Sequence, residues 1–428
     1  MKTSPGIRTA SDRDISGGGS GYGPAVSWNA PPDIPVRLDA SLVQTPNFLS
    51  QAARPGQVMV LHATGLGPVT ADETAEQLLL EVDTPADVIV GNKTAPAVLK
   101  GRGAYGQDFI VFKLPDDVQQ GCYVPIAVRA GGYTSNTGSI AVSANGGSCS
   151  DPHGFAASDI DTAQKSGGLN IGVIAINHLG FGDEAVGRFV RYGAEALGSA
   201  FAPASVDSGI RGSFAVPPLG SCTITPGSPA VELFEVPVDG TPAQRLNAGP
   251  ALNLSGPGGR VQLPAPRYQY SVGGSDVFTP GDYTVDNGAG TQTVGSFKGA
   301  LTLPPPVKWT NQDAIGSPDR SQDLTVTWTG GAADKEFVMI AGAARSEKVT
   351  AAFLCTERVS AGSFTVPARV LSNLPASAPV MDASQTLPGG LIIVATAPLT
   401  SAGRFAATGL DFGLFTYEQG AFNLVSFR

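Results

Sequence analysis

The chain has 428 residues, of which 55 are glycine, 34 are proline and only 15% are charged, and its formal net charge is −9. This length exceeds that of a single β-sandwich, so we expect two to four domains. An apolar content of 42% argues against a disordered chain. An acidic balance without a basic cluster argues against nucleic acid and anionic membranes as partners, and no apolar run is long enough to insert into a membrane.

The first 35 residues are predicted to form a flexible leader, because they are rich in glycine and serine. This segment has no apolar core and therefore lacks the pattern of a signal peptide. If the protein is exported, its signal was removed or lies upstream of this sequence.

Residues 36–146 are predicted to form a first, immunoglobulin-like β-sandwich. A Pro55-Gly56 turn leads into an apolar strand, which ends sharply at Gly65-Leu66-Gly67-Pro68 because glycine adopts positive φ and proline donates no ladder hydrogen bond. Two adjacent glycines at 131–132 predict a tight hairpin. Short alternating strands, separated by turn residues as in a sandwich, are expected at 60–63, 86–91, 108–115, 122–130 and 135–143.

Residues 147–304 are predicted to form a second β-rich domain, which opens with a loop over 147–160. One short helix is expected, at 193–201. Strands are expected at 169–179, 185–192, 231–238, 251–256, 260–264, 267–273, 281–287 and 296–304.

Three consecutive prolines, 304–306, predict a stiff joint before a third, immunoglobulin-like β-sandwich over 305–428. Leu324, Val326 and Trp328 alternate with two threonines, which is typical of a half-buried strand. Further strands are expected at 336–344, 349–357, 363–368 and 390–397 and at the C-terminus. The predicted fold class is therefore all-β, with tandem immunoglobulin-like or β-sandwich domains and one short helix.

The first domain resembles the C-terminal immunoglobulin-like domain of many secreted, uncharacterised proteins of Solibacter-type acidobacteria, which is itself similar to IPT/TIG domains. The remainder resembles the β-rich region that often follows it. The stretches that carry the resemblance are 55–68, 88–98, 106–115, 121–132, 135–136, 146–152, 218–224, 246–259, 280–290, 308–315, 324–331 and 353–368. The resemblance implies a β-rich, exported protein and no catalytic residues. The leader matches nothing in that family.

Four cysteines, an even number, favour disulfides in a chain that resembles exported β-proteins. We predict one bond between Cys122 and Cys149 and a second between Cys222 and Cys355, which would join the second domain to the third. Two alternatives stay open. In the first, Cys122 and Cys149 are two buried thiols without a bond between them. In the second, Cys355 is a free thiol packed in the core beside Trp328.

Few residues point to chemistry. The pattern G-x-G-x-x-G at 101–106 precedes a predicted strand, whereas a dinucleotide site needs a helix there, so we interpret it as a turn. The three histidines, His62, His153 and His178, are far apart in sequence, and no C-x-x-C or G-x-S-x-G pattern occurs. We therefore expect no catalytic residues, no enzyme activity and no bound cofactor, with no nucleophile and base within reach of each other in an open cleft.

Calcium is the one metal for which side-chain oxygens are available in loops. The candidates are Asp159, Asp161, Asp282, Asp286, Asn287 and Asp313. The alternative is that these residues end strands and bond their own turns. Tyr268, Tyr270 and Tyr283 are candidates for a sugar-binding platform, but we favour a core or sheet-surface role for them.

The leading functional hypothesis is a secreted or cell-surface protein that is structural or adhesive and not catalytic. Its loops and sheet faces would contact a polysaccharide or a protein. The alternatives are a filament subunit that self-associates by strand addition, or the accessory region of an extracellular hydrolase. A histidine found fully buried in apolar surroundings would count against the hydrolase.

Overall fold

The structure is a computed structural model. It describes residues 6–7, 27–29, 45–47, 49–69, 80–103, 107–151, 155–180, 182–193, 216–225, 244–273, 277–347, 349–382, 385–399 and 402–428. Strands dominate these residues, and the predicted all-β class is confirmed. No helix in the described part of the chain has the length and hydropathy of a membrane-spanning segment.

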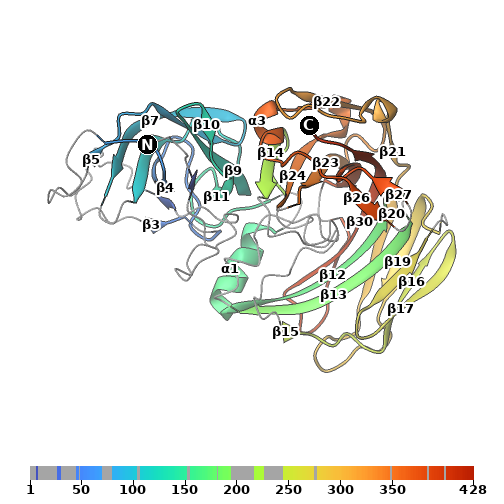
Figure 1. Ribbon diagram of the computed structural model, residues 1–428. Helices are drawn as coiled ribbons and strands as arrows, with labels where there is room; N and C mark the ends of the chain where they lie inside the picture. The colour runs from blue at the N-terminus through green and yellow to red at the C-terminus, as the bar shows by residue number, and fades with distance from the viewer. Residues whose placement is uncertain are drawn as a thin grey trace.

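An eleven-stranded sheet packs around the first hydrophobic core (Figure 1). The central order is β10-β9-β6-β7-β8-β4-β2-β3, and β1, β11 and β5 pair with β4, β9 and β7. The strands are β1 Gly6–Ile7, β2 Ser27–Asn29, β3 Thr45–Pro46, β4 Val58–Thr64, β5 Leu80–Glu81, β6 Ala86–Val90, β7 Lys93–Arg102, β8 Asp108–Lys113, β9 Gly121–Ala130, β10 Tyr133–Thr134 and β11 Gly138–Val142. Two pieces of the predicted leader, β1 and β2, thus pair with β4.

A ten-stranded sheet forms the centre of the remaining chain. Its order is β14-β24-β23-β28-β30-β12-β13-β15, with β18 on β13 and β29 on β30. The strands are β12 Gly168–His178, β13 Asp183–Gly193, β14 Ser221–Thr225, β15 Gln244–Arg245, β18 Gln269–Val272, β23 Glu336–Arg345, β24 Thr350–Arg358, β28 Gly390–Pro398, β29 Arg404–Phe405 and β30 Phe412–Val425. Strands on both sides of residue 304 share this sheet, so the sheets divide the chain differently from the predicted second and third domains.

Smaller sheets cover one face of the ten-stranded sheet. A four-stranded sheet, β17-β16-β19-β20, packs over β12, β13 and β30, and a three-stranded sheet, β21-β22-β25, packs over β23, β24 and β28. Their strands are β16 Ala251–Gly256, β17 Gly259–Pro264, β19 Gly281–Asp286, β20 Lys298–Leu303, β21 Val307–Trp309, β22 Leu324–Gly330 and β25 Ser363–Val366. The hairpin β26 Val380–Asp382 and β27 Gln385–Leu387, the helix α3 Ala368–Leu371 and the 3-10 turns η4 Gln312–Ala314 and η5 Val359–Ala361 complete this region.

The helix α1, Ala157–Ser166, occupies a segment for which we predicted a loop and the start of the second domain. Asp159 accepts a hydrogen bond from the Ala156 N–H (2.9 Å), and Gly167 ends the helix with φ 66°. Ile160 and Ala163 pack against the opposite face of β12 and β30. The helix predicted at 193–201 and the strand predicted at 231–238 lie outside the described residues, except for Gly193, which ends β13.

Both predicted disulfides are present. Cys122 and Cys149 lie with Cα atoms 5.3 Å apart, and Cys222 and Cys355 face each other directly on β14 and β24 with Cα atoms 4.0 Å apart. All four cysteines are thereby bonded, so the two free-thiol alternatives are wrong. The second bond fastens β14, the strand at one edge of the ten-stranded sheet, to its neighbour β24.

Candidate functional site

Polar side chains gather where β12 ends and β13 begins, beside the middle of β30. We call this group the polar belt: Asn177, His178, Asp183, Glu184, Tyr417, Glu418 and Gln419. The register places Asn177 between Glu184 and Glu418, and His178 between Asp183 and Gln419. Because side chains alternate along a strand, these two rows point to opposite faces of the sheet.

On the first face, His178 is held by a buried carboxylate. Its Nδ1 bonds Asp183 Oδ1, and Asp183 is only 1% exposed. The other Asp183 oxygen accepts hydrogen bonds from the backbone N–H groups of Val277 and Phe278, the latter at 2.8 Å. Asp183 therefore fixes the orientation of the ring and leaves Nε2 as the free nitrogen of a side chain that is 26% exposed.

A histidine oriented by a carboxylate is also one component of catalytic triads, which need a nucleophile besides. Among the described residues, Asp183 is the only hydrogen-bond partner of His178, and no serine or free cysteine is hydrogen-bonded to the ring. The pair can hold and orient a proton acceptor. Without a nucleophile it does not form the acyl-transfer arrangement, and our expectation of a non-catalytic protein stays a prediction.

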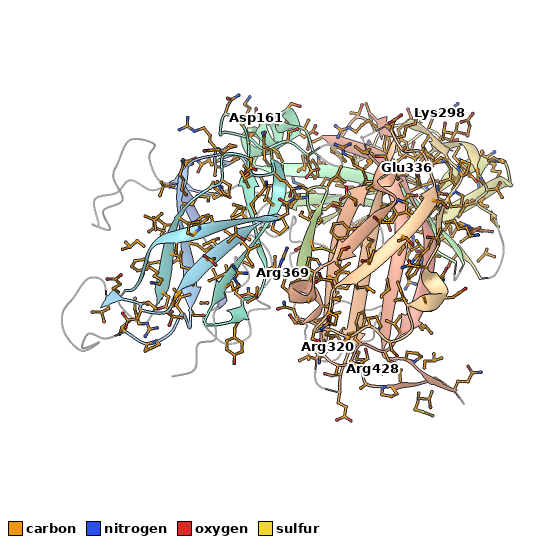
Figure 2. All side chains as sticks on the ribbon, turned by 90° about the horizontal axis from the view of Figure 1, so that it is seen from above. Asp161, Lys298, Arg320, Glu336, Arg369 and Arg428 are labelled. Carbon is orange, nitrogen blue, oxygen red and sulfur yellow. A yellow bond between two sulfur atoms is a disulfide. The ribbon has the colours of Figure 1, made fainter. Side chains whose placement is uncertain are left out.

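A buried carboxylate, Glu336, lies beside the same face at the start of β23 (Figure 2). It is fully buried and accepts hydrogen bonds from the Tyr417 hydroxyl (2.9 Å), the Ala332 N–H (2.7 Å) and, at 3.4 Å, Gln419 Nε2. Gln419 Nε2 also donates to the carbonyl of Pro304 (2.8 Å). The cluster thus connects β23 and β30 to the proline joint between β20 and β21. Burial raises the pKa of Tyr417, and the negative charge of Glu336 raises it further.

Replacing Tyr417 by phenylalanine tests this connection. We expect a loss of about 1.5–3 kcal/mol in the free energy of unfolding, because a buried carboxylate loses one of its donors while the ring stays in place. Urea denaturation of the two proteins at pH 7 measures the difference. Tyr270→Phe is the control. Tyr270 is half-buried, and its hydroxyl forms no hydrogen bond with a described residue, so this variant removes a hydroxyl without breaking such a bond. Equal losses in both variants would contradict the role given to Tyr417.

On the second face, the row Glu184–Asn177–Glu418 is only partly bonded. Asn177 Nδ2 donates to Glu184 Oε2 (3.3 Å), and Gln269 Nε2 donates to Glu184 Oε1 (2.7 Å). Asn177 Oδ1 is buried and has no hydrogen-bond partner. Glu418 is 8% exposed, and burial raises the pKa of its carboxyl to about 7.

The histidines differ from what their sequence positions suggested. His178 lies at the end of β12 and is neither fully buried nor in apolar surroundings, so the observation that would have counted against a hydrolase is absent at this residue. His62 is half-buried on β4, and His153 lies outside the described residues. The carboxylate partner of His178 escaped the sequence analysis because Asp183 follows it across a turn and carries no motif.

The calcium candidates do not gather into one site. Among the described residues there is no group of three metal-binding side chains of the histidine, cysteine, aspartate and glutamate types. Most candidates bond nearby groups instead: Asp159 pairs with Arg404, Asp161 accepts from Ser148, Asp282 accepts from Thr302, Asp286 accepts from Asn253 and Asn287 bonds Ala248. Asp313 lies in η4.

The other sequence candidates have structural positions. Tyr268 and Tyr283 are buried and Tyr270 packs beside them, so the core role that we favoured over a sugar platform agrees with the structure. The glycine pattern at 101–106 lies between β7 and β8, and its described residues belong to strand and turn with no helix after them. Residues 104–106 lie outside the described part.

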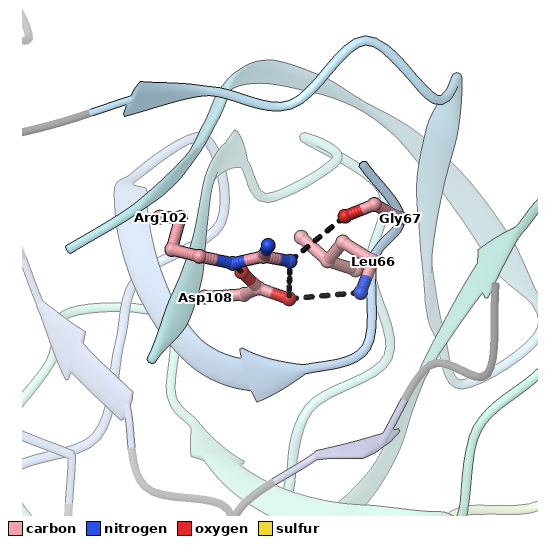
Figure 3. A network of polar contacts seen from close by, with 4 residues as sticks. All are labelled: Leu66, Gly67, Arg102 and Asp108. Atoms are coloured by element: carbon pink, nitrogen blue, oxygen red, sulfur yellow. Dashed lines mark hydrogen bonds and ion pairs between the residues drawn. The ribbon is translucent and has the colours of Figure 1, made fainter. Parts of the chain in front are cut away.

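A buried ion pair in the first domain was also missed from the sequence. Asp108 is fully buried and bonds Arg102 Nε (2.8 Å), while Arg102 Nη2 donates to the Gly67 carbonyl (2.8 Å) and the Leu66 N–H donates to Asp108 (2.8 Å) (Figure 3). The network fixes the Gly65–Pro68 break to the ends of β7 and β8. It is enclosed in the first domain and is structural.

Comparison with known proteins identifies no family. No family model and no curated protein matches the sequence. Among solved structures, an endo-fucoidan hydrolase of glycoside hydrolase family 107 aligns over 88% of this chain and 43% of its own, at 11% identity and a TM-score of 0.11. Immunoglobulin domains 1–4 of Sidekick-1 align over 93% and 91%, at 8% identity and a TM-score of 0.11. Similarity this low carries no functional argument, and the acidobacterial resemblance stays a prediction.

Proposed function

We propose that this protein is an exported, non-catalytic structural or adhesive module that presents loops and sheet faces to a polysaccharide or protein partner. The observation that carries the proposal is the ten-stranded sheet, which runs without interruption from β14 to β13 and is fastened at β14 by a disulfide. A continuous sheet with a covalent bond at one edge resists mechanical load, which suits a structural or adhesive role. Two buried disulfides also suit an oxidising compartment outside the cytoplasm.

The β9–β10 hairpin offers a contact surface for such a partner. Gly131 and Gly132 have φ angles of 56° and 85°, as the predicted tight turn requires, and they hold Tyr133 at the tip. Tyr133 is 57% exposed, which is high for a large aromatic side chain in a folded domain. Exposed tyrosines combine apolar area with a hydroxyl group and are enriched at binding surfaces.

The test is binding of the purified protein to a glycan array and to isolated surface material, with Tyr133→Ala beside the wild type. We expect a specific ligand whose affinity falls about 10-fold or more in Tyr133→Ala, as for an aromatic contact at the centre of an interface. Met381→Ala is the matched control, because Met381 is 70% exposed on β26, in a different sheet. Binding that depends on neither residue would contradict the role of the hairpin, and no binding at all would contradict the adhesive function.

The rival function, an extracellular hydrolase or its accessory region, has one observation in its favour, the His178–Asp183 pair. Incubating the bound glycan or protein with wild type and with His178→Ala separates the two. Hydrolysis by the wild type that His178→Ala abolishes would replace our proposal by an enzyme.

A further inference from the structure

The second face of the polar belt contains two acceptors with no donor between them. Asn177 Oδ1 is buried without a partner, and the neighbouring Glu418 carboxyl on β30 receives no hydrogen bond from a described residue. The Asn177 amide donates through Nδ2 toward Glu184 on β13, so its Oδ1 is turned to the other side, where β30 lies. A buried acceptor without a donor is unfavourable, and the neighbouring Glu418 carboxyl cannot satisfy it in its charged form.

A proton on Glu418 supplies that donor. A neutral carboxylic acid has one O–H that donates to an amide oxygen, and neighbouring strands place paired side chains about 4.8 Å apart, within reach of a glutamate. Burial favours the neutral form of the carboxyl, whose pKa rises to about 7. The side chain is 8% exposed, so the proton exchanges with solvent water.

Among the described residues, no charged side chain forms an ion pair or a hydrogen bond with Glu418. On β13, Glu184 already accepts hydrogen bonds from two side-chain amides. Arg188, on the same strand, pairs with Val173, which lies four residues before Asn177 on β12. On the other side of β30, the strand β28 has no titratable residue next to Glu418. Its Thr396 pairs with Gln419, the residue after Glu418. By strand alternation, His178 and the buried Glu336 belong to the opposite face.

We propose that the proton on Glu418 bonds its carboxyl to Asn177 Oδ1 and so locks β30 to β12, and that release of this proton to solvent near neutral pH loosens the junction. After release, the charged carboxylate faces the Asn177 oxygen and lies in one row with Glu184. The lock acts on the parallel ladder Ile171–His178 with Phe412–Gln419, the one parallel ladder among the described strands. The protein is then held most firmly in mildly acidic surroundings.

The sign of the pH dependence follows from linkage. Folded Glu418 keeps its proton to about pH 7, whereas an unfolded glutamate loses it near its usual value of 4.5, so this contribution to stability is present at low pH and disappears as pH rises through 7. Between pH 5 and pH 8 the unfolding equilibrium constant of the wild type should rise by roughly 50- to 100-fold through this one group.

The variant Glu418→Gln tests the lock, because glutamine has the same shape and a permanent N–H donor. We expect its unfolding constant, from urea titrations at pH 5, 6, 7 and 8, to lack this rise, so that the variant equals the wild type at pH 5 and exceeds it in stability at pH 8. Glu184→Gln is the matched control in the same row and should retain the wild-type pH dependence, because Glu184 accepts two hydrogen bonds and needs no proton.

Infrared spectroscopy gives a second, direct readout on the folded protein. A carbonyl band of a protonated carboxylic acid should be present at pH 5.5, disappear near pH 7 and be absent from Glu418→Gln. Retention of the full pH dependence by Glu418→Gln, or absence of the acid band from the wild type, would overturn the proposal. Stabilisation of the wild type but not of Glu418→Gln by calcium chloride at pH 8 would also overturn it, because a cation would then occupy the place assigned to the proton.

Discussion

Replacing Cys222 and Cys355 together by alanine should lower the free energy of unfolding by about 5 kcal/mol, the largest effect that we expect from any single bond in this protein. The two residues are 133 positions apart, so their bond closes a long loop and strongly restricts the unfolded chain. It also fastens β14, which pairs on only one side, to β24. The measurement is urea denaturation of the oxidised proteins at pH 6.

The control is the other disulfide. Cys122 and Cys149 are 27 positions apart, and their replacement by alanine should cost about 3–4 kcal/mol on the same entropic argument. A ranking in which the shorter loop costs more would show that packing around the sulfurs, and not loop closure, sets the stabilisation.

Asp108→Ala should cost about 3–5 kcal/mol, because it leaves the guanidinium of Arg102 without its carboxylate in a place where that side chain is only 12% exposed. It also leaves the Leu66 N–H without an acceptor. Thermal denaturation monitored by circular dichroism, combined with urea titration, measures the loss.

A surface pair of the same chemistry provides the comparison. Arg129 and Asp87 also lie 2.8 Å apart, but their side chains are 50% and 38% exposed, so Asp87→Ala should change stability by less than about 1 kcal/mol. The double variant Asp108→Leu with Arg102→Met should recover much of the loss, since no buried charge then stays unpaired. A double variant no better than Asp108→Ala would show that the network stabilises through its shape alone.

Individual strands were predictable because alternation is a local property. Val326 and Trp328 are buried while the threonines beside them are not, as their pattern indicated. The helix α1 was missed because, among its described side chains, it buries Ile160 and Ala163 alone, which are too few apolar residues to show a helical period. Its acidic residue near the start and the glycine after its end were the available signals.

The arrangement of strands and the polar belt were not predictable in the same way. The pairing of β12 with β30 joins segments more than two hundred residues apart, and no local pattern specifies such a partner. Asn177 lies near the end of β12 and Glu418 lies inside β30, and neither position carries a motif in the sequence. Only the register reveals that they share a row, and only burial reveals that one of them has no partner.

The position of β30 has a consequence for biogenesis. This strand, Phe412–Val425, follows every other described strand in sequence, yet it lies in the middle of the ten-stranded sheet, between β28 and β12. The inner edges of β12 and β28 therefore have no neighbour until β30 has been synthesised. The first domain can assemble before that point, whereas the ten-stranded sheet cannot be completed without β30. Pairing of β30 is thus the step that closes this sheet.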